Sequence, residues 1–247
     1  IAANEPDKLA LIWCSVHGEE KRVTFAQLKE RTDRTAAFFA SLGIRRGDPV
    51  MLVLKRHIEF WYCILALHKL GALVIPATHL LTMKDYKYRF NAAGVRAVVC
   101  TPDNDTPGHV EAVEADCPTL EHKIIVHTRR DGWHNFDDGC ACAPAFVRPT
   151  GEDAPQRDDP MLLYFTSGTT GLPKMVAHDH TYALGHLNTG VYWHDVREDG
   201  LHLTVADTGW GKAVWGKLYG QWLGGCTVMV YDFDKFVPAD LLAVMAK

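Results

Sequence analysis

The stretch Leu162-Leu-Tyr-Phe-Thr-Ser-Gly-Thr-Thr-Gly-Leu-Pro-Lys174 is the most informative part of the sequence. Its apolar start predicts a buried strand, and the loop that follows carries four hydroxyls before it ends at a lysine. Gly168 and Gly171 allow positive φ and close approach of main-chain amides to a ligand. Lys174 adds a mobile positive charge. The stretch indicates a polyphosphate site, although a turn without a ligand also fits this composition.

Two well-known nucleotide-binding patterns do not match this loop. A Walker A loop ends in Gly-Lys-Ser/Thr, whereas Lys174 stands between Pro173 and Met175. No Gly-x-Gly-x-x-Gly follows a predicted strand, so a dinucleotide-binding dehydrogenase is the weakest interpretation. An ordinary phosphate-loop kinase or NTPase is also disfavoured.

Helical and strand patterns alternate on both sides of this loop. Helices are predicted at residues 24–42, 59–70, 82–93, 107–115, 182–193 and 215–223, and strands at 9–16, 22–24, 50–54, 72–76, 96–100, 123–127, 161–165, 201–206 and 226–231. Such alternation predicts an α/β fold with mainly parallel sheets flanked by helices. Residues 141–159 read as a surface connection, which divides the chain into a first part at 1–158 and a second at 159–247.

Composition excludes several classes of protein. The net charge of -4 offers no basic field, so we expect no nucleic-acid partner. No apolar run reaches the roughly 20 residues that span a bilayer, and the first residues lack a targeting pattern, which predicts a cytosolic protein. Seven cysteines suggest reduced thiols. Cys140 and Cys142 lack a second ligand pair, so we assign no metal-ligating residues.

Residues Thr166-Ser-Gly-Thr-Thr-Gly-Leu-Pro-Lys174 resemble the signature of the adenylate-forming (AMP-binding) superfamily. Most members have glycine after the lysine, and Met175 at that position resembles the acyl-CoA synthetases of the acetyl- and medium-chain type. The segments Asp131-Gly-Trp-His-Asn-Phe136, Ala206-Asp-Thr-Gly-Trp210 and Asp234-Lys-Phe236 also look like that branch. The resemblance covers essentially the whole chain.

This resemblance implies the large αβαβα layered domain of the superfamily, incomplete here. It implies ATP-dependent activation of a short- or medium-chain carboxylic acid to acyl-AMP, then thioester formation with coenzyme A, with Mg²⁺ as a further cofactor. Lys174 and Thr166 would serve catalysis. The residues that would wrap the β- and γ-phosphates are Thr166, Ser167, Gly168, Thr169, Thr170, Gly171 and Lys174.

By the same resemblance, residues 207–215 would shape the acyl pocket, with Trp210 limiting chain length and Gly209, Gly211 and Ala213 leaving space for alkyl carbon. The alternative is that Trp210 and Trp215 are core aromatics at a helix start. The adenine and ribose sites, the acidic Mg²⁺ ligand and the small C-terminal domain with its second lysine have no counterpart, so we expect a fragment that is inactive alone. A ligase with a carrier-protein acceptor and a non-catalytic nucleotide-binding module remain alternatives.

Overall fold

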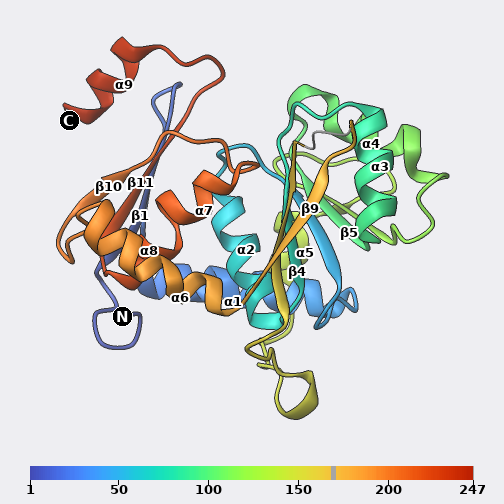
Figure 1. The fold of residues 1–247 in the computed structure, drawn as a ribbon, viewed down its shortest axis with the longest axis horizontal. Helices are drawn as coiled ribbons and strands as arrows, with labels where there is room; N and C mark the ends of the chain where they lie inside the picture. Colours follow the sequence, from blue (N-terminus) through green and yellow to red (C-terminus); the bar gives the residue numbers. More distant parts are fainter. Residues whose placement is uncertain (168–170, 247) are drawn as a thin grey trace.

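The computed structural model describes residues 1–167 and 171–246, and within them the strands form two sheets (Figure 1). The larger sheet has the order β7-β6-β5-β3-β4-β8-β9. Its strands are β3 (Pro49–Val53), β4 (Leu73–Pro76), β5 (Ala97–Cys100), β6 (His122–Ile125), β7 (His134–Asn135), β8 (Pro160–Thr166) and β9 (Lys174–Asp179). Only β9 runs antiparallel to its neighbour in the described part of this sheet.

Helices cover both faces of the larger sheet because its strands are apolar on both sides. On one face, Leu52 and Val99 pack with α1 (Phe25–Ser41) and α2 (Glu59–Leu70). On the other, Met51 and Val98 pack with α3 (Met83–Ala93) and α4 (Thr106–Glu114). Alternate residues of one strand therefore serve different cores, as parallel sheets require. The predicted α/β class is confirmed.

The smaller sheet has the order β10-β11-β1-β2 and joins residues from both ends of the chain. Its strands are β1 (Leu9–Ser15), β2 (Glu20–Thr24), β10 (Leu201–Leu203) and β11 (Thr227–Asp232). β11 is parallel to β1, with Leu11 opposite Val228. α2 lies between the two sheets, where the Trp61 indole donates to the Lys217 carbonyl at 3.1 Å (Figure 1). The division at residues 158 and 159 stays a proposal, and each sheet draws strands from both sides of it.

Local signals explain the helices that were predicted most accurately. The Thr24 hydroxyl accepts from the Gln27 amide, and the Gln27 side chain accepts from the Thr24 amide, which caps α1. Gly71 ends α2 in the left-handed region at φ 72°. Thr82 and Asp85 form the equivalent cap of α3.

Several elements differ from the predictions. The helix expected at 182–193 is α6 (Thr181–Asn188) followed by a π-helical turn (Thr189–Trp193). The helix expected at 215–223 is two helices, α7 (Gly211–Lys217) and α8 (Tyr219–Leu223), which break at Leu218. The strand expected at 201–206 stops at Leu203. The elements that were not predicted are β7, β9, α5 (Phe136–Cys142), α9 (Pro238–Met245) and short 3₁₀ turns at Asp103–Asp105 and Gly151–Asp153.

Two negative properties of the described chain bear on its partners. All seven cysteines lie in the described ranges, and none of them is joined to another in a disulfide bond. No helix within residues 1–167 and 171–246 combines the length and apolar character needed to cross a bilayer.

Candidate functional site

The hydroxyl-rich loop joins two antiparallel strands. Thr166 ends β8 and pairs with Lys174, which begins β9. The sequence predicted a lysine at the end of a loop, but Lys174 is the first residue of a strand. Of the residues assigned to phosphate binding, Gly168, Thr169 and Thr170 lie outside the described residues. Thr166, Ser167, Gly171 and Lys174 are described.

The described parts of this loop present their polar groups to solvent. Thr166, Ser167 and Lys174 are exposed, and no described residue forms an ion pair with Lys174. Gly171 has φ 99°, as its expected role in the turn requires. The Tyr88 hydroxyl of α3 donates to the Pro173 carbonyl at 2.9 Å and fixes the chain just before Lys174. The lysine is thus held at its base while its ammonium group stays available to an anion.

The first part of the predicted acyl segment, residues 207–211, is anchored to the larger sheet by its backbone. A Cβ atom built on Gly209 would lie 2.2 Å from the Thr78 amide nitrogen, so only glycine fits this approach. The buried Thr208 hydroxyl donates to the Lys55 carbonyl. The Asp207 carboxylate accepts from the Gly209 amide at 2.9 Å. These contacts attach the segment to the ends of β3 and β4 at once.

The Trp210 side chain is exposed, and the space beside the Gly211 Cα is open. Trp210 is 65% exposed and stands at the N-terminus of α7, so it is not the core aromatic of the alternative interpretation. A Cβ on Gly211 would meet no described atom within 4 Å. The exposed indole and the open glycine are compatible with a wall of a pocket, and the pocket role stays a prediction.

Segment 207–211 and the hydroxyl-rich loop share one edge of the larger sheet. The chain leaves β3 for α2 on one face and leaves β4 for α3 on the other, so the carboxyl ends of β3 and β4 flank a topological switch point. Ligands of open α/β sheets bind at such points. Val74 of β4 pairs with Leu162 of β8, which brings Thr78 and Thr166 to the same edge. The two predicted regions are therefore neighbours in the fold.

A buried cluster of charged side chains adjoins this edge and was not predicted. Lys55 follows β3 in the left-handed region at φ 47°. Its ammonium group lies 2.6 Å from Asp234, 3.6 Å from Asp232 and 3.8 Å from Asp103. Burial lowers the pKa of Lys55, but the three carboxylates raise it further, so the net shift is upward. The Lys55 ammonium group therefore links the ends of the two sheets through ion pairs.

Arg56 makes a second link between the ends of the two sheets. Its guanidinium donates to the Phe233 carbonyl and stacks over the Phe233 ring at 4.0 Å. It also lies 3.5 Å from the Asp207 carboxylate. Burial raises the pKa of Asp207, while His79, the Gly209 amide and Arg56 lower it below its usual range. The aspartate of the predicted acyl segment is therefore an anion with fixed partners.

A cavity of about 490 Å³ opens beside these charged groups. The residues that line it come from the carboxyl ends of both sheets and from the β1–β2 hairpin, among them Trp13, His17, Lys55, His57, Glu59, Asp103, His127 and Asp232. A usable signal was present in the sequence, because Lys55-Arg-His57 directly follows an apolar strand. Polar residues at that place in a parallel sheet face its functional edge.

Comparison with known proteins gives one family over the whole chain. The family described as AMP-binding enzyme matches residues 1–247. Acyl-coenzyme A synthetase ACSM5 of Rattus norvegicus is 36% identical over 99% of this chain. Acyl-coenzyme A synthetase ACSM3 of Homo sapiens is 31% identical over 100% of it. The chain spans 42% of the length of each of these two relatives.

A solved structure confirms the architecture. The anthranilate CoA ligase AuaEII, crystallised with anthranoyl-AMP, superposes with a TM-score of 0.87 over 99% of this chain and 46% of its own. At 23% identity this likeness concerns the fold alone. The expectation of a cytosolic protein is wrong, because the relatives from rat, mouse and human are named as mitochondrial.

Proposed function

The chain belongs to the AMP-binding enzyme family, and from that premise we propose that it forms the phosphate-binding and acid-binding part of an acyl-CoA synthetase. The parent enzyme would convert a short- or medium-chain carboxylic acid to its acyl-AMP with ATP, and then to a thioester with coenzyme A. The observation that carries this proposal is the position of segment 207–211 at the switch point, on the same edge as the hydroxyl-rich loop.

The chemistry requires two anions to meet. A substrate carboxylate attacks the α-phosphate of ATP, so the protein must reduce charge repulsion and hold the leaving pyrophosphate in line. Lys174 supplies a positive charge without a competing carboxylate among the described residues. The exposed hydroxyls of Thr166 and Ser167 supply donors at its side. Gly168, Thr169 and Thr170, which lie outside the described residues, would complete the proposed cradle together with Gly171.

The residues present also fit Mg²⁺ as a companion of the nucleotide. Mg²⁺ prefers oxygen ligands and is usually held by few protein groups together with phosphate oxygens. The Thr166 and Ser167 hydroxyls are exposed oxygen donors at the phosphate loop. When bound, the ion would neutralise part of the polyphosphate charge. Lys174 would neutralise part of the remaining negative charge of the polyphosphate and orient the phosphate chain.

The acid would lie along segment 207–211. Gly209 brings the backbone against Thr78, and Gly211 leaves space where a side chain would stand. Trp210 lies between them with its indole exposed, where an alkyl chain can cover it. We propose that this indole sets the length limit of the acid. The names of the relatives also support a mitochondrial location.

The test is acid-dependent exchange of pyrophosphate into ATP, with straight-chain acids from acetate to decanoate. It is run on the 247-residue chain and on a version extended to the length of the relatives. We expect exchange in the extended chain only, with a maximum at one acid, and thioester formation when coenzyme A is added. ATP binding without exchange in either chain would contradict the proposal and favour a nucleotide-binding module. Product formed with a carrier protein but not with coenzyme A would identify a different ligase.

A further inference from the structure

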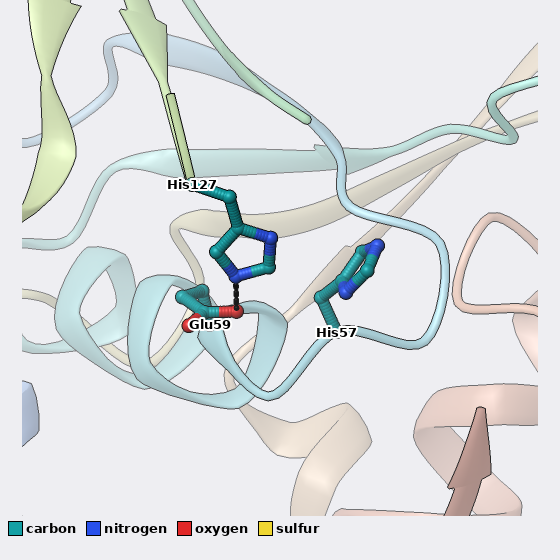
Figure 2. Close-up of side chains that lie close together, drawn as sticks. All are labelled: His57, Glu59 and His127. Carbon is teal, nitrogen blue, oxygen red and sulfur yellow. Dashed lines mark ion pairs between the residues drawn. The ribbon is translucent and has the colours of Figure 1, made fainter. Parts of the chain in front are cut away.

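Three metal-ligating side chains meet at the start of α2, on the side of β3 away from the hydroxyl-rich loop. His57 precedes the helix, Glu59 is its first residue, and His127 follows β6 (Figure 2). One ligand atom from each of the three lies within 4.8 Å of the others. His57 and Glu59 are two residues apart in the sequence, and the adjacency of β3, β5 and β6 in the sheet brings His127 to them.

The geometry of the three side chains suits a single ion between them. The His127 Nε2 atom is 3.1 Å from the Glu59 Oε2 atom, as the dashed line in Figure 2 shows. The His57 and His127 rings are 4.8 Å apart and nearly perpendicular, at 83°. His127 takes the left-handed conformation at φ 67°, which is uncommon outside glycine. A strained backbone conformation therefore turns this imidazole toward the cluster.

Carboxylates stand behind His57 on both sides of its ring. Its Nε2 atom is 3.0 Å from Asp103, and its Nδ1 atom is 3.5 Å from Asp232. The Thr101 hydroxyl donates to the same Asp103 oxygen at 2.5 Å and fixes that carboxylate. Histidines that bind metals commonly donate their other N–H to a carboxylate, which fixes the tautomer and the ring. Whichever nitrogen of His57 faces an ion, the other keeps a carboxylate partner.

The charge of the surroundings fits a divalent cation. Five carboxylates line the adjoining cavity, and the described lysines there are Lys21 and Lys55. The carboxylates are Glu19, Glu59, Asp103, Asp232 and Asp234. An excess of negative charge remains while the histidines are neutral, and a dication would reduce it. The cavity also leaves an open position for water or a further ligand.

We propose that His57, Glu59 and His127 form a binding site for a divalent transition-metal ion of the Zn²⁺ type. Two imidazoles and one carboxylate are a ligand set typical of open zinc sites, and they suit Mg²⁺ and Ca²⁺ poorly because those ions prefer oxygen. The site is independent of the proposed function and differs from the sequence analysis, which assigned no metal ligands. Its open position faces the cavity of about 490 Å³.

Zn²⁺ itself is the probe. The 247-residue chain is stripped with a chelator, dialysed in reducing buffer and titrated with Zn²⁺ by calorimetry. We expect one ion per chain, and substitution by Co²⁺ should give a spectrum without a thiolate charge-transfer band. Absence of a stoichiometric site, or a spectrum dominated by thiolate, would refute the proposal.

Variants locate the ion. His127→Gln and Glu59→Gln should each weaken Zn²⁺ binding more than about 100-fold. Loss of a residue that only hydrogen-bonds to a metal ligand typically weakens binding 10–100-fold, and loss of a ligand itself should cost more. Asp103→Asn changes a carboxylate that contacts His57, and it should weaken Zn²⁺ binding about 10–100-fold. His134→Gln removes an exposed histidine and Cys142→Ser an exposed thiol, and neither should change the affinity.

Folding is checked for each variant by its melting temperature. Glu59 is buried, so its variant can lose binding by losing structure. His127 is more accessible, with 38% of its side chain exposed, and its variant decides the matter if Glu59→Gln does not fold. A folded His127→Gln chain that binds Zn²⁺ as tightly as the unaltered chain would overturn the assignment.

Discussion

The backbones of Gly209 and Thr78 are in contact, at the point where the segment that follows β10 reaches the end of β4. A Cβ on Gly209 would stand 2.2 Å from the Thr78 nitrogen and 2.5 Å from the Ala77 carbonyl carbon. Both obstacles are main-chain atoms, which cannot move aside as a flexible side chain can. The close approach links segment 207–211 to the edge of the larger sheet.

We expect Gly209→Ala to lower the free energy of unfolding by roughly 1–3 kcal/mol, because an added methyl must displace the backbone of Ala77 and Thr78, which follow β4. Gly211→Ala is the matched control. It lies two residues away with no described atom within 4 Å of its added Cβ, and it should be neutral or stabilising by up to about 1 kcal/mol. Urea denaturation of both variants measures the difference. Equal stabilities would show that the contact with Thr78 is not tight in solution.

Trp210→Ala should leave the stability of the 247-residue chain within about 0.5 kcal/mol of its original value, since the indole is largely exposed. In the extended enzyme the same change should shift the preferred acid toward longer chains. Trp61→Ala is the contrasting variant, because that indole is fully buried and its loss should cost about 3–5 kcal/mol. A strongly destabilised Trp210→Ala chain, or an unchanged acid profile, would argue against a pocket wall.

Lys174→Ala should reduce acid-dependent pyrophosphate exchange of the extended enzyme by roughly 100-fold, because it removes a charge that stabilises the leaving group. The melting temperature should not change, since the lysine is exposed. Lys84→Ala removes another exposed lysine, from helix α3, and serves as the control. Exchange that survives in the Lys174 variant at the level of the control would exclude the proposed role.

His68 predicts a pH dependence of stability. It is partly buried, faces the Tyr219 hydroxyl at 2.8 Å and lies near His180, and desolvation lowers its pKa to about 3. Above pH 6.5 neither state carries the proton. Between pH 6.5 and about 3 the unfolded chain binds it and the folded chain does not, so acid favours unfolding by up to about 1.4 kcal/mol per pH unit.

The measurement is urea denaturation at pH 7, 6 and 5. His68→Gln keeps a polar partner for Tyr219 and should lose this component of the pH slope, so its stability relative to the unaltered chain should improve toward pH 5. His134→Gln, at an exposed position, should keep the original slope. Parallel slopes for the unaltered chain and His68→Gln would mean that His68 accepts a proton in the folded state.

Elements with strong local signals could be predicted closely. The helix predicted at 59–70 has the bounds of α2, and the helix predicted at 82–93 differs from α3 by one residue, because Gly71 and Gly94 stop the two helices and Thr82 caps the second. The break between α7 and α8 could not be predicted, since the sequence there has no proline. The Trp61 indole donates to the Lys217 carbonyl, which is a tertiary contact, and the Gln221 side chain accepts from the Leu218 amide, which caps the start of α8 locally.

The candidate site was predictable only where its residues are contiguous. The hydroxyl-rich loop and segment 207–211 were found because each lies within a few residues of sequence. The charged cluster of Lys55, Asp103 and Asp232 was missed, because its members are separated by 48 and 129 residues and meet through strand order. Strand order depends on which surfaces are buried together, and periodicity carries no information about it.

The pairing of β1 with β11 has a consequence for how the chain acquires its structure during synthesis. β1 needs a partner on each side, and the second one, beginning at Thr227, emerges about 200 residues later. At about 5–20 residues per second the ribosome needs roughly 10–40 s to make that distance. For that time the β1–β2 hairpin exposes an apolar strand edge, which is a template for wrong pairing. We expect nascent chains arrested before β11 to depend on chaperones, and chains released after it to depend on them less.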